Sequence, residues 1–135
     1  MKVVILAAGF GTRVSHLTGG RPKALMPYLG ATLLDALVQA LPEYAAITLV
    51  SNAKYLDQFH EWAGSTARQL CILNNGISDP SERKGALFDL GLGLDAAGRN
   101  EKVVVLGSDS LFRFDLSLFF DAFRATESNL VGVRH

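Results

Sequence analysis

Residues 2–13 read KVVILAAGFGTR, an apolar run that passes directly into a loop containing two glycines. The run is continuous rather than alternating, which is typical of a strand buried on both faces of a parallel sheet. It is short, and it ends in the glycine loop without the continuation that a signal peptide needs. We therefore interpret residues 2–6 as a buried strand.

The rest of the chain alternates strand-like and helix-like segments. Apolar runs at residues 47–51, 70–73 and 102–106 indicate three more buried strands. Between the strands, helical periodicity is clearest at residues 33–41 and weaker at 55–63 and 86–97. This order favours an α/β fold, a Rossmann-like, doubly wound and mostly parallel sheet flanked by helices.

The end of the chain predicts two more elements. Residues 115–126 look helical, with Asp115 as the N-cap, and residues 130–133 look like a further strand. A chain of 135 residues suits one domain, residues 1–135, rather than two. Because the last predicted strand lies almost at the final residue, we expect this domain to be truncated, the amino-terminal part of a longer fold.

Composition narrows the expected partners and compartment. Thirteen basic residues balance thirteen acidic ones, and neither sign forms a run of five, so we expect no nucleic acid and no anionic membrane as partner. The sequence contains no uninterrupted stretch of eighteen apolar residues, so we expect no transmembrane helix. The single cysteine, Cys71, cannot form an internal disulfide, and the expected location is cytoplasmic.

The loop after the first strand carries the main chemical signal. Glycines at 9 and 11 let backbone N–H groups approach an anion closely, and phosphate is the expected guest. A dinucleotide fingerprint needs a third glycine where this chain has Val14, and the Gly-Lys-Ser/Thr of a Walker loop is absent. Two cations flank the loop, Arg13 and, ten residues later, Lys23.

These residues resemble the signature of the sugar-phosphate and related nucleotidyltransferases, at Leu6-Ala7-Ala8-Gly9-x-Gly11-Thr12-Arg13, Leu17-Thr18 and Pro22-Lys23-x-Leu25-x-Pro27. The resemblance implies that Arg13 holds a nucleoside triphosphate and that Lys23 faces the phosphates at the reacting centre, which makes both catalytic candidates. It also implies that the loop binds the nucleotide through Leu6, Ala8, Gly9, Gly11 and Thr12. The chain departs from the family at His16 and Ala24, where proline is usual.

A carboxylate follows the last strong strand. Asp109 comes just after residues 102–106, at the predicted carboxyl end of that strand. Mg²⁺ is held by one or two carboxylates together with phosphate and water oxygens. Asp109 also resembles the metal aspartate of the family, so we expect it to bind Mg²⁺ and the nucleotide in one crevice with Arg13 and Lys23. The alternative is an ordinary turn aspartate.

The polar loop at residues 74–87 opens a predicted helix. In the resembling family, a polar side chain after this strand and a glycine at the start of the helix contact the nucleobase. The resemblance therefore implies base contacts from Asn74 or Asn75 and from Gly85. Ordinary turn chemistry explains these residues about as well.

The implied activity is Mg²⁺-dependent transfer of a nucleoside monophosphate from an NTP to a phosphorylated small-molecule acceptor, with release of pyrophosphate. A sugar 1-phosphate is the first choice of acceptor, ahead of phosphocholine or inositol phosphate. The alternative is a non-catalytic, nucleotide-binding or regulatory module that lacks the acceptor half. Every motif found serves the triphosphate, so we expect this chain alone to bind nucleotide with little transfer, and to self-associate as a homo-oligomer through its terminal strand.

Overall fold

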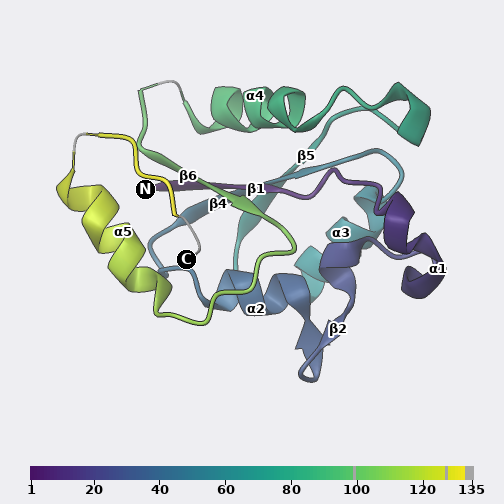
Figure 1. The fold of residues 1–135 in the computed structure, drawn as a ribbon, viewed down its shortest axis with the longest axis horizontal. Coiled ribbons are helices and arrows are strands. Elements are labelled where there is room, and N and C mark those ends of the chain that lie inside the picture. Colours follow the sequence, from purple (N-terminus) through teal and green to yellow (C-terminus); the bar gives the residue numbers. More distant parts are fainter. Residues whose placement is uncertain (99, 127, 133–135) are drawn as a thin grey trace.

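The fold is a parallel sheet between two layers of helices, in a computed structural model that describes residues 1–98, 100–126 and 128–132 (Figure 1). Its strands are β1 (Lys2–Leu6), β4 (Ala46–Ser51), β5 (Leu70–Asn74) and β6 (Val103–Gly107). They pair in the order β5-β4-β1-β6, and every pair is parallel. The Rossmann-like α/β class is confirmed, and the four expected strands begin and end within one residue of their predicted positions.

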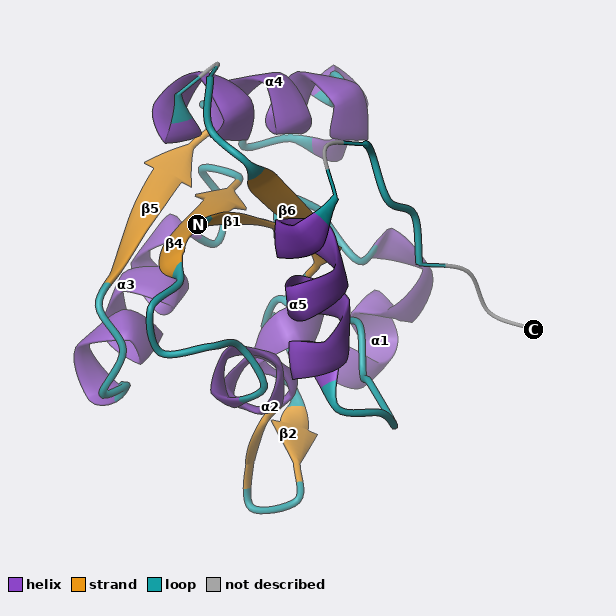
Figure 2. Ribbon diagram, turned by 90° about the vertical axis from the view of Figure 1, so that its left-hand side faces the viewer, coloured by secondary structure: helices purple, strands orange, loops and turns teal. Residues whose placement is uncertain are grey.

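Helices cover both faces of the sheet (Figure 2). The helix α4 (Ala86–Ala97) lies on one face. The other face carries α2 (Leu33–Gln39), α3 (Leu56–Ser65) and α5 (Leu116–Ala125). All four helices were predicted, and the carboxylate of Asp115 caps α5 by accepting a 2.9 Å hydrogen bond from the backbone nitrogen of Ser117. None of the helices in the described ranges is both long and apolar enough to cross a membrane.

The first strand is buried on both faces, which explains its continuous apolar run. Val3 and Ile5 belong to the larger core beneath α2, α3 and α5, whereas Val4 belongs to a smaller core that includes Ala97 of α4. Val3, Val4 and Ile5 have no exposed surface. Successive side chains of a strand point to opposite faces, so a strand between two helical layers needs apolar residues at every position.

Two helices of the larger layer are tied together by a half-buried carboxylate. Asp35 forms a capping box with Thr32 at the start of α2 and accepts a 2.9 Å hydrogen bond from the indole nitrogen of Trp62 in α3. Burial raises the pKa of Asp35, but hydrogen bonds from Thr32 and Trp62 outweigh this effect and hold the pKa below its ordinary value. The folded state therefore favours the charged form of the Asp35 carboxyl group.

The order of the strands brings two loops together at the carboxyl end of the sheet. The chain passes from β1 to β4 on one side and later returns to β6 on the other side of β1. Leu6 lies opposite Gly107, and the backbone nitrogen of Ser108 donates a 3.1 Å hydrogen bond to the carbonyl of Leu6. The glycine loop and the segment with Asp109 therefore begin side by side, at a point where ligands of such sheets usually bind.

Several short elements were not predicted. The loop after the glycines contains single turns of helix, η1 (Thr12–Val14), α1 (Ser15–Thr18) and η2 (Lys23–Leu25). A hairpin of two-residue strands, β2 (Pro27–Tyr28) and β3 (Ala31–Thr32), precedes α2, and one more turn, η3 (Pro80–Glu82), lies before α4. Elements this short carry no periodicity that a sequence pattern can reveal.

The predicted strand at residues 130–133 is wrong for the residues that the structure describes. Residues 130–132 are irregular, and no strand of the described chain pairs with them. They share a hollow with Phe119 and Phe123 of α5, and Val131 is largely exposed. The same hollow is lined by β6, so these residues lie near the edge of the sheet without pairing with it. Residue 133 lies outside the described ranges.

The close approach of α4 to the sheet depends on Gly93. A Cβ atom at Gly93 would overlap with Cγ1 of Val4 and lie 3.3 Å from Cγ2 of Val50. We expect Gly93→Ala to lower the free energy of unfolding by about 1–3 kcal/mol through overpacking, although alanine is the better helix former. Urea denaturation measures this change.

The matched control is Gly91→Ala in the same helix. Gly91 is exposed, and a Cβ atom there would meet nothing within 4 Å. Its replacement is expected to raise the free energy of unfolding by up to about 1 kcal/mol. Equal stabilisation by both substitutions would contradict this account of the packing between α4 and β1.

Candidate functional site

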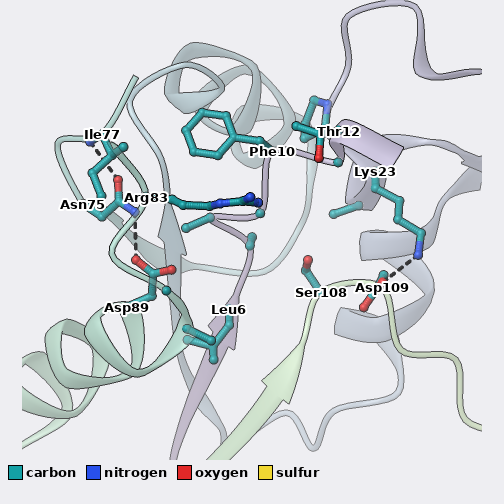
Figure 3. A pocket seen from close by; sticks show the side chains of 18 of the residues that line it. Leu6, Phe10, Thr12, Lys23, Asn75, Ile77, Arg83, Asp89, Ser108 and Asp109 are labelled. Carbon is teal, nitrogen blue, oxygen red and sulfur yellow. Dashed lines mark hydrogen bonds and ion pairs between the residues drawn. The ribbon is translucent and has the colours of Figure 1, made fainter. Parts of the chain in front are cut away.

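An open pocket of about 580 Å³ lies at the carboxyl ends of β1 and β6 (Figure 3). One wall is the glycine loop with the following turn, residues 6–14, together with residues 22–24. The opposite wall comes from the start of α4 and the loop before it, and Ser108 and Asp109 close one end. Three segments that are distant in the sequence therefore meet at this edge of the sheet.

The pocket collects nearly all of the residues that the sequence singled out. Those that line it are Leu6, Ala8, Gly9, Gly11, Thr12, Arg13, Lys23, Gly85 and Asp109. Asn74 is not among the lining residues, whereas its neighbour Asn75 is. Arg13, Lys23 and Asp109 thus line one pocket, as expected, and the roles of these residues stay predictions.

The glycine loop leaves backbone accessible on its pocket side. Gly11 has a φ of 60°, a left-handed conformation that glycine adopts without strain. A Cβ atom at Gly9 would meet no protein atom within 4 Å, so the packing of the protein itself does not require glycine there. A ligand that approaches the backbone closely would require it.

Two buried side chains that sequence reasoning missed hold this loop in place. Asn52 is fully buried, donates a 2.9 Å hydrogen bond to the carbonyl of Ala8, and accepts one of 3.0 Å from the backbone nitrogen of Tyr55. The Tyr55 hydroxyl donates to the carbonyl of Phe10 at 3.2 Å. Asn52 follows the carboxyl end of β4, and a polar residue at that place is the signal that could have revealed it.

An ion pair connects the glycine-loop wall to the end of the pocket that Asp109 closes. Nζ of Lys23 lies 2.7 Å from Oδ2 of Asp109, and both side chains are about half exposed at 49%. Exposed pairs of this kind contribute about 0–1 kcal/mol, because water competes for both charges. The pair is therefore weak enough to be exchanged for a phosphate on Lys23 and a cation on Asp109.

Asp109 is a single carboxylate rather than part of a cluster. Among the described residues, no group of three or more histidine, cysteine, aspartate or glutamate side chains is placed to hold a metal ion. Mg²⁺ commonly takes only one or two carboxylates when phosphate and water oxygens supply its other ligands. The donor at this position therefore fits a metal that arrives with a phosphorylated ligand.

The end of the pocket nearest α4 is built from an amide, a carboxylate and two cations. The Asn75 side chain donates to Oδ1 of Asp89 at 2.8 Å and accepts from the backbone nitrogen of Ile77 at 2.9 Å. Gly85, with a φ of 88°, begins α4 at the pocket wall. Arg83 and Lys84 also line the pocket, and sequence reasoning assigned neither of them a role.

The glycine loop, its flanking cations and the strand-end carboxylate meet at one edge of a Rossmann-like α/β sheet. The model of the nucleotidyl transferase family matches residues 2–134, and the chain belongs to this family. The resemblance noted in the sequence is confirmed.

Curated relatives act on sugar phosphates. N-acetylmuramate alpha-1-phosphate uridylyltransferase of Caulobacter vibrioides is 38% identical over 84 residues, which cover 62% of this chain and 34% of that protein. The catalytic subunit beta of mannose-1-phosphate guanylyltransferase of Danio rerio is 28% identical over 134 residues, which cover 97% of this chain and 37% of that protein. The chain therefore spans about a third of the length of these relatives.

A solved structure shares the fold. A Bacillus anthracis protein assigned as a glucose-1-phosphate thymidylyltransferase superposes with a TM-score of 0.81 at 23% identity. The match covers 94% of this chain and 51% of that one. It shows that the sheet and its helices are arranged as in about half of that structure.

The support of the glycine loop by Asn52 can be tested directly. We expect Asn52→Ala to cost about 2–3 kcal/mol of unfolding free energy, because the carbonyl of Ala8 and the nitrogen of Tyr55 lose their buried partner. Tyr55→Phe removes one hydroxyl from the same loop and should cost only about 1 kcal/mol. Equal losses in thermal and urea denaturation would show that Asn52 has no special part in holding the loop.

Proposed function

We propose that the chain binds a nucleoside triphosphate and belongs to an enzyme that transfers a nucleoside monophosphate to a phosphorylated acceptor. The observation that carries the proposal is the single pocket in which a glycine loop, Arg13, Lys23 and Asp109 meet. Membership of the nucleotidyl transferase family supports it. The curated relatives are sugar-phosphate nucleotidyltransferases, and a sugar 1-phosphate is accordingly the first acceptor to test.

The proposed role of each residue follows from its charge. Backbone N–H groups of residues 9–12 and the guanidinium of Arg13 hold the triphosphate, while the ammonium of Lys23 faces the α-phosphate. The acceptor phosphate attacks the α-phosphorus in line, and the bond to pyrophosphate breaks, so no covalent enzyme intermediate is needed. Two anions meet in this step, and the fixed cations offset their repulsion and the charge on the leaving pyrophosphate.

Asp109 is the residue proposed to hold Mg²⁺, together with oxygens of the triphosphate. A metal ion bound there would neutralise charge on the phosphates. Binding also has to separate Lys23 from Asp109, whose present contact is a half-exposed ion pair. The lysine would then be released towards the nucleotide as the aspartate takes up the cation.

A non-catalytic nucleotide-binding module is the second candidate, because every lining residue with an assigned role serves the triphosphate and none serves an acceptor. Pyrophosphate release separates the two functions. It should be measured on the polypeptide expressed from its own complete reading frame, with a panel of NTPs and with sugar 1-phosphates, phosphocholine or inositol phosphate. Release that requires an acceptor supports the transferase, and nucleotide binding without release for any pair favours the module.

Arg13 provides the first test of nucleotide binding. We expect Arg13→Ala to weaken NTP binding by about 2–3 kcal/mol, because a charge-assisted partner of the phosphates is lost. Arg21→Ala is the matched control, since Arg21 is also exposed but does not line the pocket. Isothermal titration calorimetry measures both, and an NTP affinity within twofold of the parent for Arg13→Ala would refute the assignment.

Asp109 provides the test of metal binding. Asp109→Asn keeps the shape of the side chain and removes its charge, so the increase in NTP affinity on adding Mg²⁺ should be lost. Asp115→Asn is the control, because Asp115 caps α5 outside the pocket and asparagine is an equally good cap. If Mg²⁺ strengthens NTP binding by the Asp109 variant as much as by the parent, Asp109 is a turn residue.

A further inference from the structure

The ion pair between Lys23 and Asp109 engages both of its members completely. Figure 3 shows the lysine reaching from the glycine-loop wall to the carboxylate at the end of the pocket. Nζ lies 2.7 Å from Oδ2, and neither side chain has a hydrogen bond or ion pair with any other described residue. The proposed phosphate partner and the proposed metal ligand therefore neutralise each other.

This pairing is not general in the pocket. Of its two carboxylates, Asp89 is held at 2.8 Å by the neutral amide of Asn75, and only Asp109 meets a cation among the described residues. The ammonium of Lys84 lies 4.5 Å from the centre of the Phe88 ring and has no anionic partner in the described chain. Lys84 and Asp89 thus carry the same charges as the pair, in the same pocket, without being paired to each other.

The pair can open without a change in the backbone. Lys23 begins η2, and the next two residues, Ala24 and Leu25, are buried in the larger core. The backbone nitrogen of Met26 donates a 3.1 Å hydrogen bond to the carbonyl of Lys23 and closes the turn. The ammonium, by contrast, stands on a flexible four-carbon stem and is half exposed. Rotation of this side chain is enough to separate the two charges.

Each ligand on its own meets an opposing charge at this pair. A divalent cation that takes Oδ2 of Asp109 displaces the ammonium of Lys23 and leaves it nearby without a counter-ion. A positive charge about 5 Å from a divalent cation weakens its binding about tenfold even at the dielectric constant of water. A phosphate that takes Lys23 leaves the bare carboxylate beside it in the same way. When both ligands arrive, each charge has a new partner, and the cation also contacts the phosphate.

We infer that the ion pair between Lys23 and Asp109 is a latch that makes the binding of a divalent cation and of a phosphate anion cooperative. Either ligand alone has to break the pair and leave one charge without a partner, whereas the two ligands together replace both contacts. Coupling of this kind is reciprocal, so the cation raises the affinity for phosphate by the factor by which the phosphate raises the affinity for the cation. The inference rests on the proposed function, because both ligands belong to one bound nucleotide.

The first experiment titrates Mn²⁺ alone into the complete polypeptide, without phosphate or nucleotide, and follows the free ion by electron paramagnetic resonance. We expect Lys23→Gln to bind Mn²⁺ about tenfold more tightly than the parent, because Asp109 has lost its competing cation. Lys84→Gln removes the same charge from the pocket but leaves the pair intact, and should stay within about threefold of the parent. The gain should be absent when Lys23→Gln is combined with Asp109→Asn.

The second experiment titrates inorganic pyrophosphate in the presence of EDTA. Asp109→Asn should bind pyrophosphate about tenfold more tightly than the parent, because the ammonium of Lys23 is then free and no carboxylate lies beside the anion. Asp89→Asn is the matched control and should stay within about threefold of the parent. A residue that only held a metal would leave metal-free binding of pyrophosphate unchanged. Thermal denaturation checks that each variant is folded.

Three results overturn the latch. They are Mn²⁺ binding by Lys23→Gln within about twofold of the parent, an equal gain in Lys84→Gln or in the double variant, and pyrophosphate binding by Asp109→Asn no tighter than by Asp89→Asn. If the parent still binds NTP in a manner that depends on Arg13, these results leave the proposed function standing. A parent that binds no NTP overturns the proposed function as well.

Discussion

The pairing of β1 with a parallel neighbour on each side is the constraint on which the site depends. Val3, Val4 and Ile5 have no exposed surface, and the strand is flanked by β4 and β6 in matched register. Since all three strands end at one edge, their following loops must share the space there. The glycine loop, Asn52 and Asp109 follow β1, β4 and β6 respectively, and each takes its place in the site from the strand before it.

A buried amide makes the glycine loop part of the core. The Asn52 side chain has no exposed surface and joins the carbonyl of Ala8 to the backbone nitrogen of Tyr55. Buried hydrogen bonds of this kind are costly to leave unmade, so the loop is held in one arrangement before any ligand arrives. The Lys23–Asp109 pair differs because it is half exposed and weak. The glycine loop, which Asn52 holds in place, offers backbone groups to the pocket. The Lys23–Asp109 pair offers charges that can change partners.

The sequence predicts what depends on local pattern and misses what depends on contact. Continuous apolar runs located the four strands of the parallel sheet, and the glycine spacing located one wall of the pocket. The apolar residues at 130–132 look like a strand, but they lie over a hollow bordered by β6 and α5 without pairing with the sheet. β5 extends one residue further than predicted, to Asn74, and because side chains alternate, Asn75 rather than Asn74 reaches the pocket. Tyr55 and Arg83 carry no signal of their own until the chain is folded, and the one signal for Asn52 is its place just after a predicted strand.

The two walls of the pocket share an anchor at the carboxyl end of β4. Asn52 and Tyr55 hold the glycine-loop wall through hydrogen bonds to the carbonyls of Ala8 and Phe10. The hydrogen bond between Asn75 and Asp89 joins the loop after β5 to α4 in the other wall. No hydrogen bond or ion pair among the described residues joins Arg83 to the glycine loop. The backbone nitrogen of Asn75 donates a 2.9 Å hydrogen bond to the carbonyl of Ser51, and that of Ala53 donates one of 2.9 Å to the carbonyl of Ile77, so the loop of the α4 wall is tied to the residues on either side of Asn52. Because hydrogen bonds inside a protein are coupled through shared partners, a change in the loop after β5 is expected to reach the support of the glycine loop through the residues around Asn52.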